Sequence, residues 1–118
     1  MIELDPKDIH RIHADQMRAE VKKKLGDYQG AMADYDKAIE RDPKNTSAYG
    51  MRGQEKAILG DYQGALADFD KMIELAPSSF DGYMFRGSVK MQLGDYQGAM
   101  ADWEMEEALL EQKLNSSH

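Results

Sequence analysis

The sequence contains no cysteine, which excludes disulfides, thiolate zinc ligands and cysteine nucleophiles. Basic residues are outnumbered: 15 Lys and Arg stand against 22 Asp and Glu, and the resulting net charge of -7 disfavours nucleic acid and anionic membranes as partners. Long apolar runs are missing, and the mean hydropathy of -0.71 predicts no membrane span. The N-terminal residues MIELDPKDIH carry acids where a secretory signal needs bases and an apolar stretch, so we expect a cytoplasmic protein.

A repeated segment of seven residues organises the chain. The run LGDYQGA starts at residue 25, again at 59 and again at 93, so the copies lie 34 residues apart. Further positions agree in all three copies: Asp34 with Asp68 and Asp102, and the aromatic residues Tyr35, Phe69 and Trp103. Copies this similar indicate recent duplication or deliberate consensus design, and the sequence does not distinguish the two.

Each repeat is predicted to be a pair of helices joined by a short turn. Gly60 is suited to end one helix in the left-handed conformation, and Asp61 is suited to cap the next. The apolar residues Ala65, Phe69 and Met72 then follow the spacing of an amphipathic helix. No alternation typical of strands occurs, so the fold is expected to be all-α.

These residues resemble the tetratricopeptide repeat, a 34-residue helix–turn–helix pattern of spaced aromatic, glycine, alanine and proline positions. The second copy meets the pattern with Tyr49, Gly53, Ala65, Phe69 and Pro77. The third has Tyr83, Gly87, Ala99 and Trp103, and the first keeps Ala19, Ala31, Tyr35 and Pro43. The resemblance implies an α-solenoid of three helix–turn–helix repeats in one domain, 1–118, with repeats at about 12–45, 46–79 and 80–114.

The chain departs from the family pattern in its charges. Arginine replaces the family's leucine, and an aspartate recurs in step with it on the second helix of each pair. We therefore predict three ion pairs within repeats, Arg18 with Asp34, Arg52 with Asp68 and Arg86 with Asp102. Lysine likewise replaces the family's tyrosine, at Lys22, Lys56 and Lys90. At the first end of the array, Asp5 and Pro6 are suited to cap and start a helix, and Asp15 is expected in an outer, wet position.

One side of each first helix is left uncovered by its own pair, and the resemblance implies that this side lines a concave groove for peptides. Carried over by position, the groove row is His13, Met17, Glu20 and Lys24, then Ser47, Met51, Gln54 and Ile58, then Asp81, Phe85, Ser88 and Gln92, with Gln16 and Met84 beside it. The centre of this row is apolar and rich in methionine, a residue typical of adaptable binding surfaces. Packing between neighbouring pairs is the alternative for Met84.

The best-known relatives in this family clamp a partner's C-terminal carboxylate with Lys, Arg and Asn on this face. Here Met51 and Phe85 stand there instead, and only His13 and Lys24 offer positive charge. We therefore expect a protein or peptide partner of another kind, an apolar helix or extended segment. Gln16, Glu20 and Gln54 would supply hydrogen bonds at its rim.

Catalytic and metal sites are not expected. His10 and His13 are spaced for one helix face, but a stable zinc site needs three or four ligands. Glu106 and Glu107 form a carboxylate pair on a solvated helix with no apolar pocket to raise a pKa. The segment LGDYQGA lacks the lysine of a phosphate loop. The sequence predicts no enzyme, no cofactor and no metal.

The last helix is more apolar than a bare end of a repeat array should be. Its apolar residues either cover the helix pair itself or meet a second molecule, as a possible homodimer, through Trp103, Leu109, Leu110 and Leu114. A self-associating assembly module is therefore one alternative function. An engineered scaffold without a natural ligand is another, because the copies are so similar.

Overall fold

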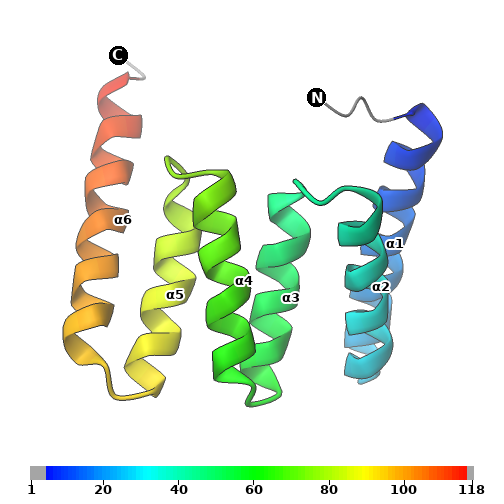
Figure 1. Cartoon of the computed structure of the whole chain (residues 1–118), viewed down its shortest axis with the longest axis horizontal. Helices are drawn as coiled ribbons and strands as arrows, with labels where there is room; N and C mark the ends of the chain where they lie inside the picture. Colours follow the sequence, from blue (N-terminus) through cyan, green and yellow to red (C-terminus); the bar gives the residue numbers. More distant parts are fainter. Residues whose placement is uncertain (1–4, 117–118) are drawn as a thin grey trace.

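The computed structural model describes residues 5–116, and all of the regular structure in that range is helical. The helices are α1 (Pro6–Lys24), α2 (Tyr28–Arg41), α3 (Thr46–Ile58), α4 (Tyr62–Leu75), α5 (Phe80–Gln92) and α6 (Tyr96–Ser116). Consecutive helices run antiparallel and stand in a row, α1 and α2 at one end and α6 at the other (Figure 1). The all-α helical repeat fold is thus confirmed.

The turn inside each pair follows the predicted chemistry. Gly60 has a φ of 87°, in the left-handed region that glycine tolerates best. Asp61 then caps α4 by accepting a hydrogen bond from the backbone N–H of Gly64 at 2.9 Å. A Cβ at Gly64 would lie 2.2 Å from Oδ2 of Asp61, so the capping carboxylate occupies the space of a side chain there. The same geometry recurs at the other two pair turns.

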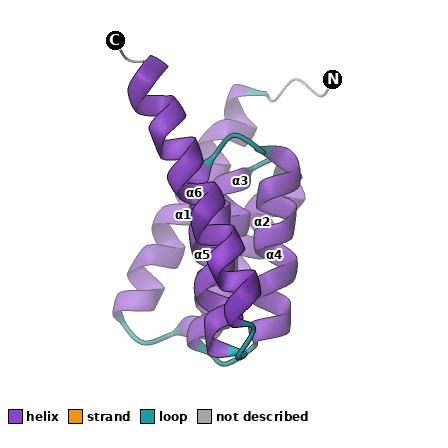
Figure 2. Cartoon of the chain, turned by 90° about the vertical axis from the view of Figure 1, so that its left-hand side faces the viewer, coloured by secondary structure: helices purple, strands orange, loops and turns teal. Residues whose placement is uncertain are grey.

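The core lies where each pair packs on itself and on the next pair. Figure 2 shows the row of helices from its α6 end. Small residues let the helices approach: Ala19, Ala31 and Ala65 are fully buried. A Cβ at Gly53 would lie 2.6 Å from the ring of Phe69. Apolar contacts of this kind supply most of the stability of a helical array, because a single pair cannot bury its apolar face.

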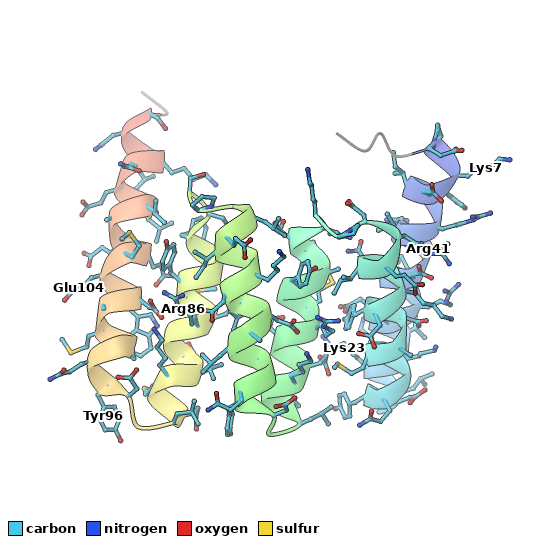
Figure 3. All side chains as sticks on the ribbon, viewed as in Figure 1. Lys7, Lys23, Arg41, Arg86, Tyr96 and Glu104 are labelled. Carbon is cyan, nitrogen blue, oxygen red and sulfur yellow. The ribbon has the colours of Figure 1, made fainter. Side chains whose placement is uncertain are left out.

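The predicted arginine and aspartate pairs are present. Arg86 donates to both oxygens of Asp102, at 2.9 Å from Nε and 2.7 Å from Nη2, and it lies between α5 and α6 (Figure 3). Arg52 binds Asp68 in the same way, whereas Arg18 approaches Asp34 only to 3.7 Å. The bidentate geometry gives these buried carboxylates two charge-assisted hydrogen bonds each.

A lysine adds a second cation to each of these carboxylates. Lys90 lies 3.2 Å from Oδ2 of Asp102, and Lys22 and Lys56 take the same place in the other pairs. Burial alone would raise the pKa of Asp102, but hydrogen bonds and charge from Arg86 and Lys90 lower it below its usual value. The two departures from the family pattern thus form one charged unit.

The expectation that Asp15 lies in a wet position is wrong. Asp15 is 1% exposed and accepts hydrogen bonds from Arg18 and from Arg41, the latter at 2.8 Å. Although α1 is an end helix of the row, the position of Asp15 faces its own partner α2 rather than the open side. A buried carboxylate is tolerated there because two guanidinium groups satisfy it.

The last helix is the longest and continues to Ser116 without a break. Across the described range 5–116, no helix is both long and apolar enough to cross a membrane.

Candidate functional site

The groove row lies on α1, α3 and α5, four residues from each helix, and every member keeps exposed surface. The exposed members are His13, Met17, Lys24, Ser47, Ile58, Ser88 and Gln92, and the half-buried members are Glu20, Met51, Gln54, Asp81 and Phe85. Gln16 and Met84, predicted beside the row, are half-buried as well. The row is therefore available to solvent along its length.

A surface hollow of ≈ 330 Å³ lies between α3 and α5, and we call it the α3–α5 hollow. Five of its lining residues belong to the groove row: Ser47, Met51, Gln54, Asp81 and Phe85. The other four, Thr46, Gly50, Met72 and Ser79, were not predicted. Gly50 could have been recognised, because the corresponding positions carry the larger Gln16 and Met84 and a glycine there opens space.

Two further hollows flank this one. His13 and Gln16 line a hollow between α1 and α3, together with Ser47. Ile58, Ser88 and Gln92 line another between the later turns of α3 and α5. The predicted residues Met17, Glu20, Lys24 and Met84 line none of these three hollows.

The floor of the α3–α5 hollow is apolar and is held by the core behind it. Phe85 stacks on Phe69 with ring centroids 5.4 Å apart and an interplanar angle of 30°. Met51 packs against the buried cluster that contains Tyr35. Met72 is 7% exposed and reaches the hollow from α4. These contacts fix the floor while leaving an edge of Met51 and Phe85 open.

The rim is polar and carries an acid. Ser47, Gln54 and Asp81 offer hydroxyl, amide and carboxylate groups, and the lining includes no lysine or arginine. Lys23 of α1 is turned inward, with Nζ 3.0 Å from Glu55 and 3.7 Å from Glu20. Burial would lower the pKa of Lys23, but these two carboxylates raise it above its usual value. Nothing at this hollow matches a cationic clamp for a carboxylate.

The side chains considered for metal binding or acid–base chemistry do not form a cluster of ligands in the described part of the chain. His10 and His13 are both exposed, and no group of three His, Asp or Glu side chains within 5–116 is arranged to hold a metal ion. Glu107 is exposed and Glu106 is half-buried on α6.

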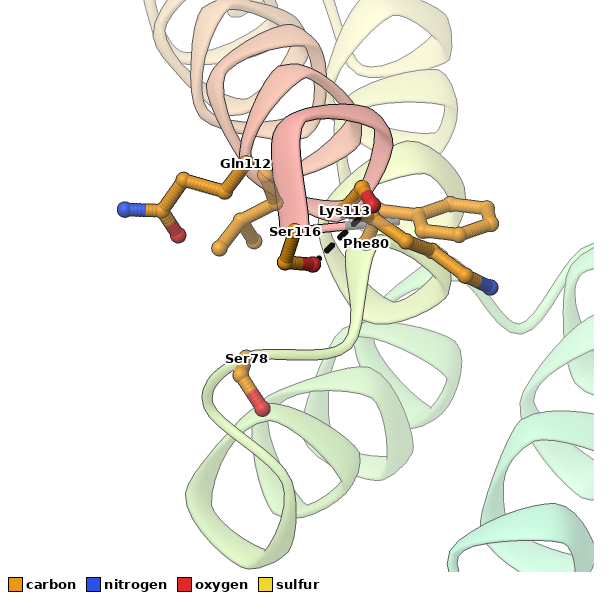
Figure 4. Close-up of a pocket in the computed structure, with 6 residues that line it drawn as sticks. Ser78, Phe80, Gln112, Lys113 and Ser116 are labelled. Atoms are coloured by element: carbon orange, nitrogen blue, oxygen red, sulfur yellow. Dashed lines mark hydrogen bonds between the residues drawn. The ribbon is translucent and has the colours of Figure 1, made fainter. Parts of the chain in front are cut away.

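The four residues predicted for self-association behave differently from one another. Trp103 is half-buried, and its Nε1 lies 3.4 Å from the backbone oxygen of Met84, to which it donates. Leu109 lines a hollow of ≈ 520 Å³ with Phe80, between the end of α6 and the α4–α5 loop (Figure 4). Leu110 is half-buried, and Leu114 is 64% exposed. Leu109 therefore faces its own helix pair, while Leu114 is open.

Comparisons with known proteins agree with this architecture. The first tetratricopeptide domain of Spaghetti (RPAP3), solved with the HSP90 peptide SRMEEVD, is 23% identical, with a TM-score of 0.81 over 92% of this chain and 84% of that one. The second domain of the same protein, with the same peptide, is 24% identical, with a TM-score of 0.77 over 84% of this chain and 86% of that one. These likenesses show a shared fold.

A longer structure matches as well. The TPR2AB domain of yeast Sti1, solved in a complex with pHSP90, is 20% identical with a TM-score of 0.85. The match covers 97% of this chain and 43% of that structure. No curated protein sequence matches the chain. A family model described as the tetratricopeptide repeat matches residues 17–79 and 51–108, which together cover most of the sequence. The chain belongs to the tetratricopeptide repeat family.

Proposed function

We propose that this chain is a non-enzymatic interaction module that holds a peptide along the groove row, centred on the α3–α5 hollow. The observation that supports this most is the apolar floor of Met51, Met72 and Phe85 beside a polar rim. A floor of this kind accepts an apolar side chain, and the rim can bond the peptide backbone on either side of it. The solved structures that share the fold and hold HSP90 peptides support a peptide as the class of ligand.

The charge of the hollow favours a ligand without an essential C-terminal carboxylate. Asp81 lines the hollow and Glu20 lies further along the row, so an acidic peptide would meet like charge. We therefore propose that the ligand is an apolar helix or extended segment, with Leu or Met side chains over the floor. The two flanking hollows lengthen the surface that such a segment can follow.

Selection from a library of random heptapeptides with amidated C-termini tests this proposal. The selected peptides should carry an apolar residue at a fixed position and bind the parent protein more tightly than the synthetic peptide SRMEEVD does. Ser47→Trp fills the rim of the hollow from an exposed position, and Met51→Glu places a charge on its floor. Each substitution should weaken binding by a factor of about 10 or more, or about 1.4 kcal/mol.

Met105→Glu is the matched control, because Met105 is 45% exposed on α6 and does not line the hollow. Circular dichroism and urea unfolding should show that all three variants remain folded. Binding by Ser47→Trp and Met51→Glu at the affinity of the parent would move the site away from the α3–α5 hollow. Tighter binding of SRMEEVD than of any amidated peptide would contradict the proposed ligand chemistry.

A further inference from the structure

Inside the molecule, each helix pair contacts the next through residues at fixed positions of the repeat. The outermost helices, α1 and α6, have residues at these same repeat positions. At the junction of α4 and α5, Phe85 stacks on Phe69 and Val89 packs in the cluster that includes Leu66. The corresponding residues of α1 are Met17 and Val21, and those of α6 are Trp103 and Met100. Both halves of a further junction are therefore present, one at each end.

These end positions are open where their internal counterparts are covered. Val89 is 4% exposed, whereas Val21 is 55% exposed. Leu66 is half-buried, whereas Met100 is 58% exposed. At the start of these two helices, Tyr62 of α4 is half-buried, whereas its counterpart Tyr96 of α6 is 67% exposed. The apolar surface that one helix pair buries against the next is exposed on α1 and on α6.

Charge at the two ends is complementary in the same register. Nη1 of Arg52 reaches Asp36 of the preceding pair at 2.8 Å, and Nη1 of Arg86 reaches Asp70 at 2.9 Å. The next acid in this series is Glu104, which is exposed and makes no ion pair within the described residues (Figure 3). The first arginine in the series, Arg18, lies on α1, the first described helix. Within the described residues there is no preceding helix pair to supply an acid for its Nη1.

The outermost helices are also extended to match each other. Thr46 begins α3 and corresponds to Ile12, so α1 has six additional residues, 6–11. Arg41 ends α2 and corresponds to Leu109, so α6 has seven additional residues, 110–116. An α1 stacked antiparallel on α6 would place these extensions side by side. The α1 extension carries Lys7 and Arg11, and the facing stripe of α6 carries Glu107 and Glu111.

We propose that copies of this chain associate head to tail, with α1 of one copy stacked on α6 of the next as α5 stacks on α4. Arg18 of one copy then binds Glu104 of its neighbour, and Met17 and Val21 cover Trp103 and Met100. Such a contact joins two different surfaces and leaves one of each free at the ends of every assembly, so it does not close at a dimer. The groove row continues from one copy to the next.

Two substitutions that each block one end test this arrangement. Val21→Glu blocks the α1 end, and Met100→Glu blocks the α6 end; both residues are exposed, so both variants should fold. In sedimentation velocity from about 10 μM to about 1 mM, the average mass of the parent should rise past twice the chain mass. Each variant alone should remain a monomer. A mixture of equal amounts should form a dimer, because one intact junction can form between the two variants.

The mixing experiment separates this arrangement from a symmetric dimer through α6. In a symmetric dimer Val21→Glu would still dimerise, Met100→Glu would not, and the mixture would contain no dimer of the two different variants; that result would overturn the proposal. A parent that remains a monomer across the range would overturn it as well. Met105→Glu, on another side of α6, should assemble like the parent. Peptide binding by the monomeric Met100→Glu variant reports on the α3–α5 hollow independently.

Discussion

At the scale of single residues, Glu55 is a buried charge that is expected to depend on one ion pair. It is fully buried, its Oε2 has no hydrogen-bond partner in the described part of the chain, and Lys23 supplies the facing charge at 3.0 Å. At the corresponding junction of the next pair, the same two positions hold Val89 and Ala57, which pack together. One junction is thus charged where the other is apolar.

Lys23→Ala should lower the free energy of unfolding by about 3 kcal/mol, because it leaves a buried carboxylate without its cation. Adding Glu55→Val recreates the apolar junction and should restore most of the loss. Urea unfolding at pH 7 measures both changes. The neighbouring Lys24→Ala is the control, since Lys24 is exposed and a surface change of this kind alters stability by no more than about 0.5 kcal/mol. A double variant as unstable as Lys23→Ala would show that the ion pair is not the cause.

The sequence contained the signal for this pair, although we did not predict it. A lysine at 23 and a glutamate at 55 stand at positions that are apolar in another copy, and adjacent helices carry them. The pairs of Arg52 and Arg86 within each repeat were predictable from their period, but their second bonds to Asp36 and Asp70 were not, because these join successive repeats. Asp15 was misplaced because one sequence position does not reveal which neighbour a helix face meets.

At the scale of helices, the cap and the glycine that follows it act together. Glycine in a helix normally costs about 1 kcal/mol relative to alanine, so Gly64→Ala would be expected to stabilise α4. Because the added Cβ would lie 2.2 Å from Oδ2 of Asp61, we expect the carboxylate to leave its capping position and the gain to disappear. In an Asp61→Ala background the same change should stabilise by about 1 kcal/mol. Urea unfolding of the four proteins measures the coupling, and strictly additive effects would disprove it.

Helix starts and turns were predictable because their signals are local. Asp5, Gly60 and Asp61 act within a few residues, and the structure places each as predicted. The α3–α5 hollow was only partly predictable. Periodicity indicates which side of a helix is free, whereas the depth of the hollow depends on Gly50 and on Met72 of another helix. These depend on how the pairs pack in three dimensions.

At the scale of the whole molecule, the row of helices gives unequal stability along its length. The pair α3 and α4 has a neighbouring pair on both sides, whereas α1 and α2, and likewise α5 and α6, have one. In an array held by contacts between neighbours, the pairs with fewer contacts open at lower free energy. The last residue of α4, Leu75, corresponds to Leu109 of α6. Residues 110–116 of α6 therefore have no counterpart in α4.

Among the described helices, hydrogen exchange followed by mass spectrometry should therefore show the slowest exchange in α3 and α4 and the fastest in residues 110–116 of α6. The measurement is best made on Val21→Glu, so that self-association does not protect the ends. Mixing with the Met100→Glu protein should slow exchange in residues 110–116 of the Val21→Glu protein. In that mixture α1 of the Met100→Glu protein would cover α6 of the Val21→Glu protein. Uniform exchange along the chain would instead indicate that the three pairs unfold as one cooperative unit.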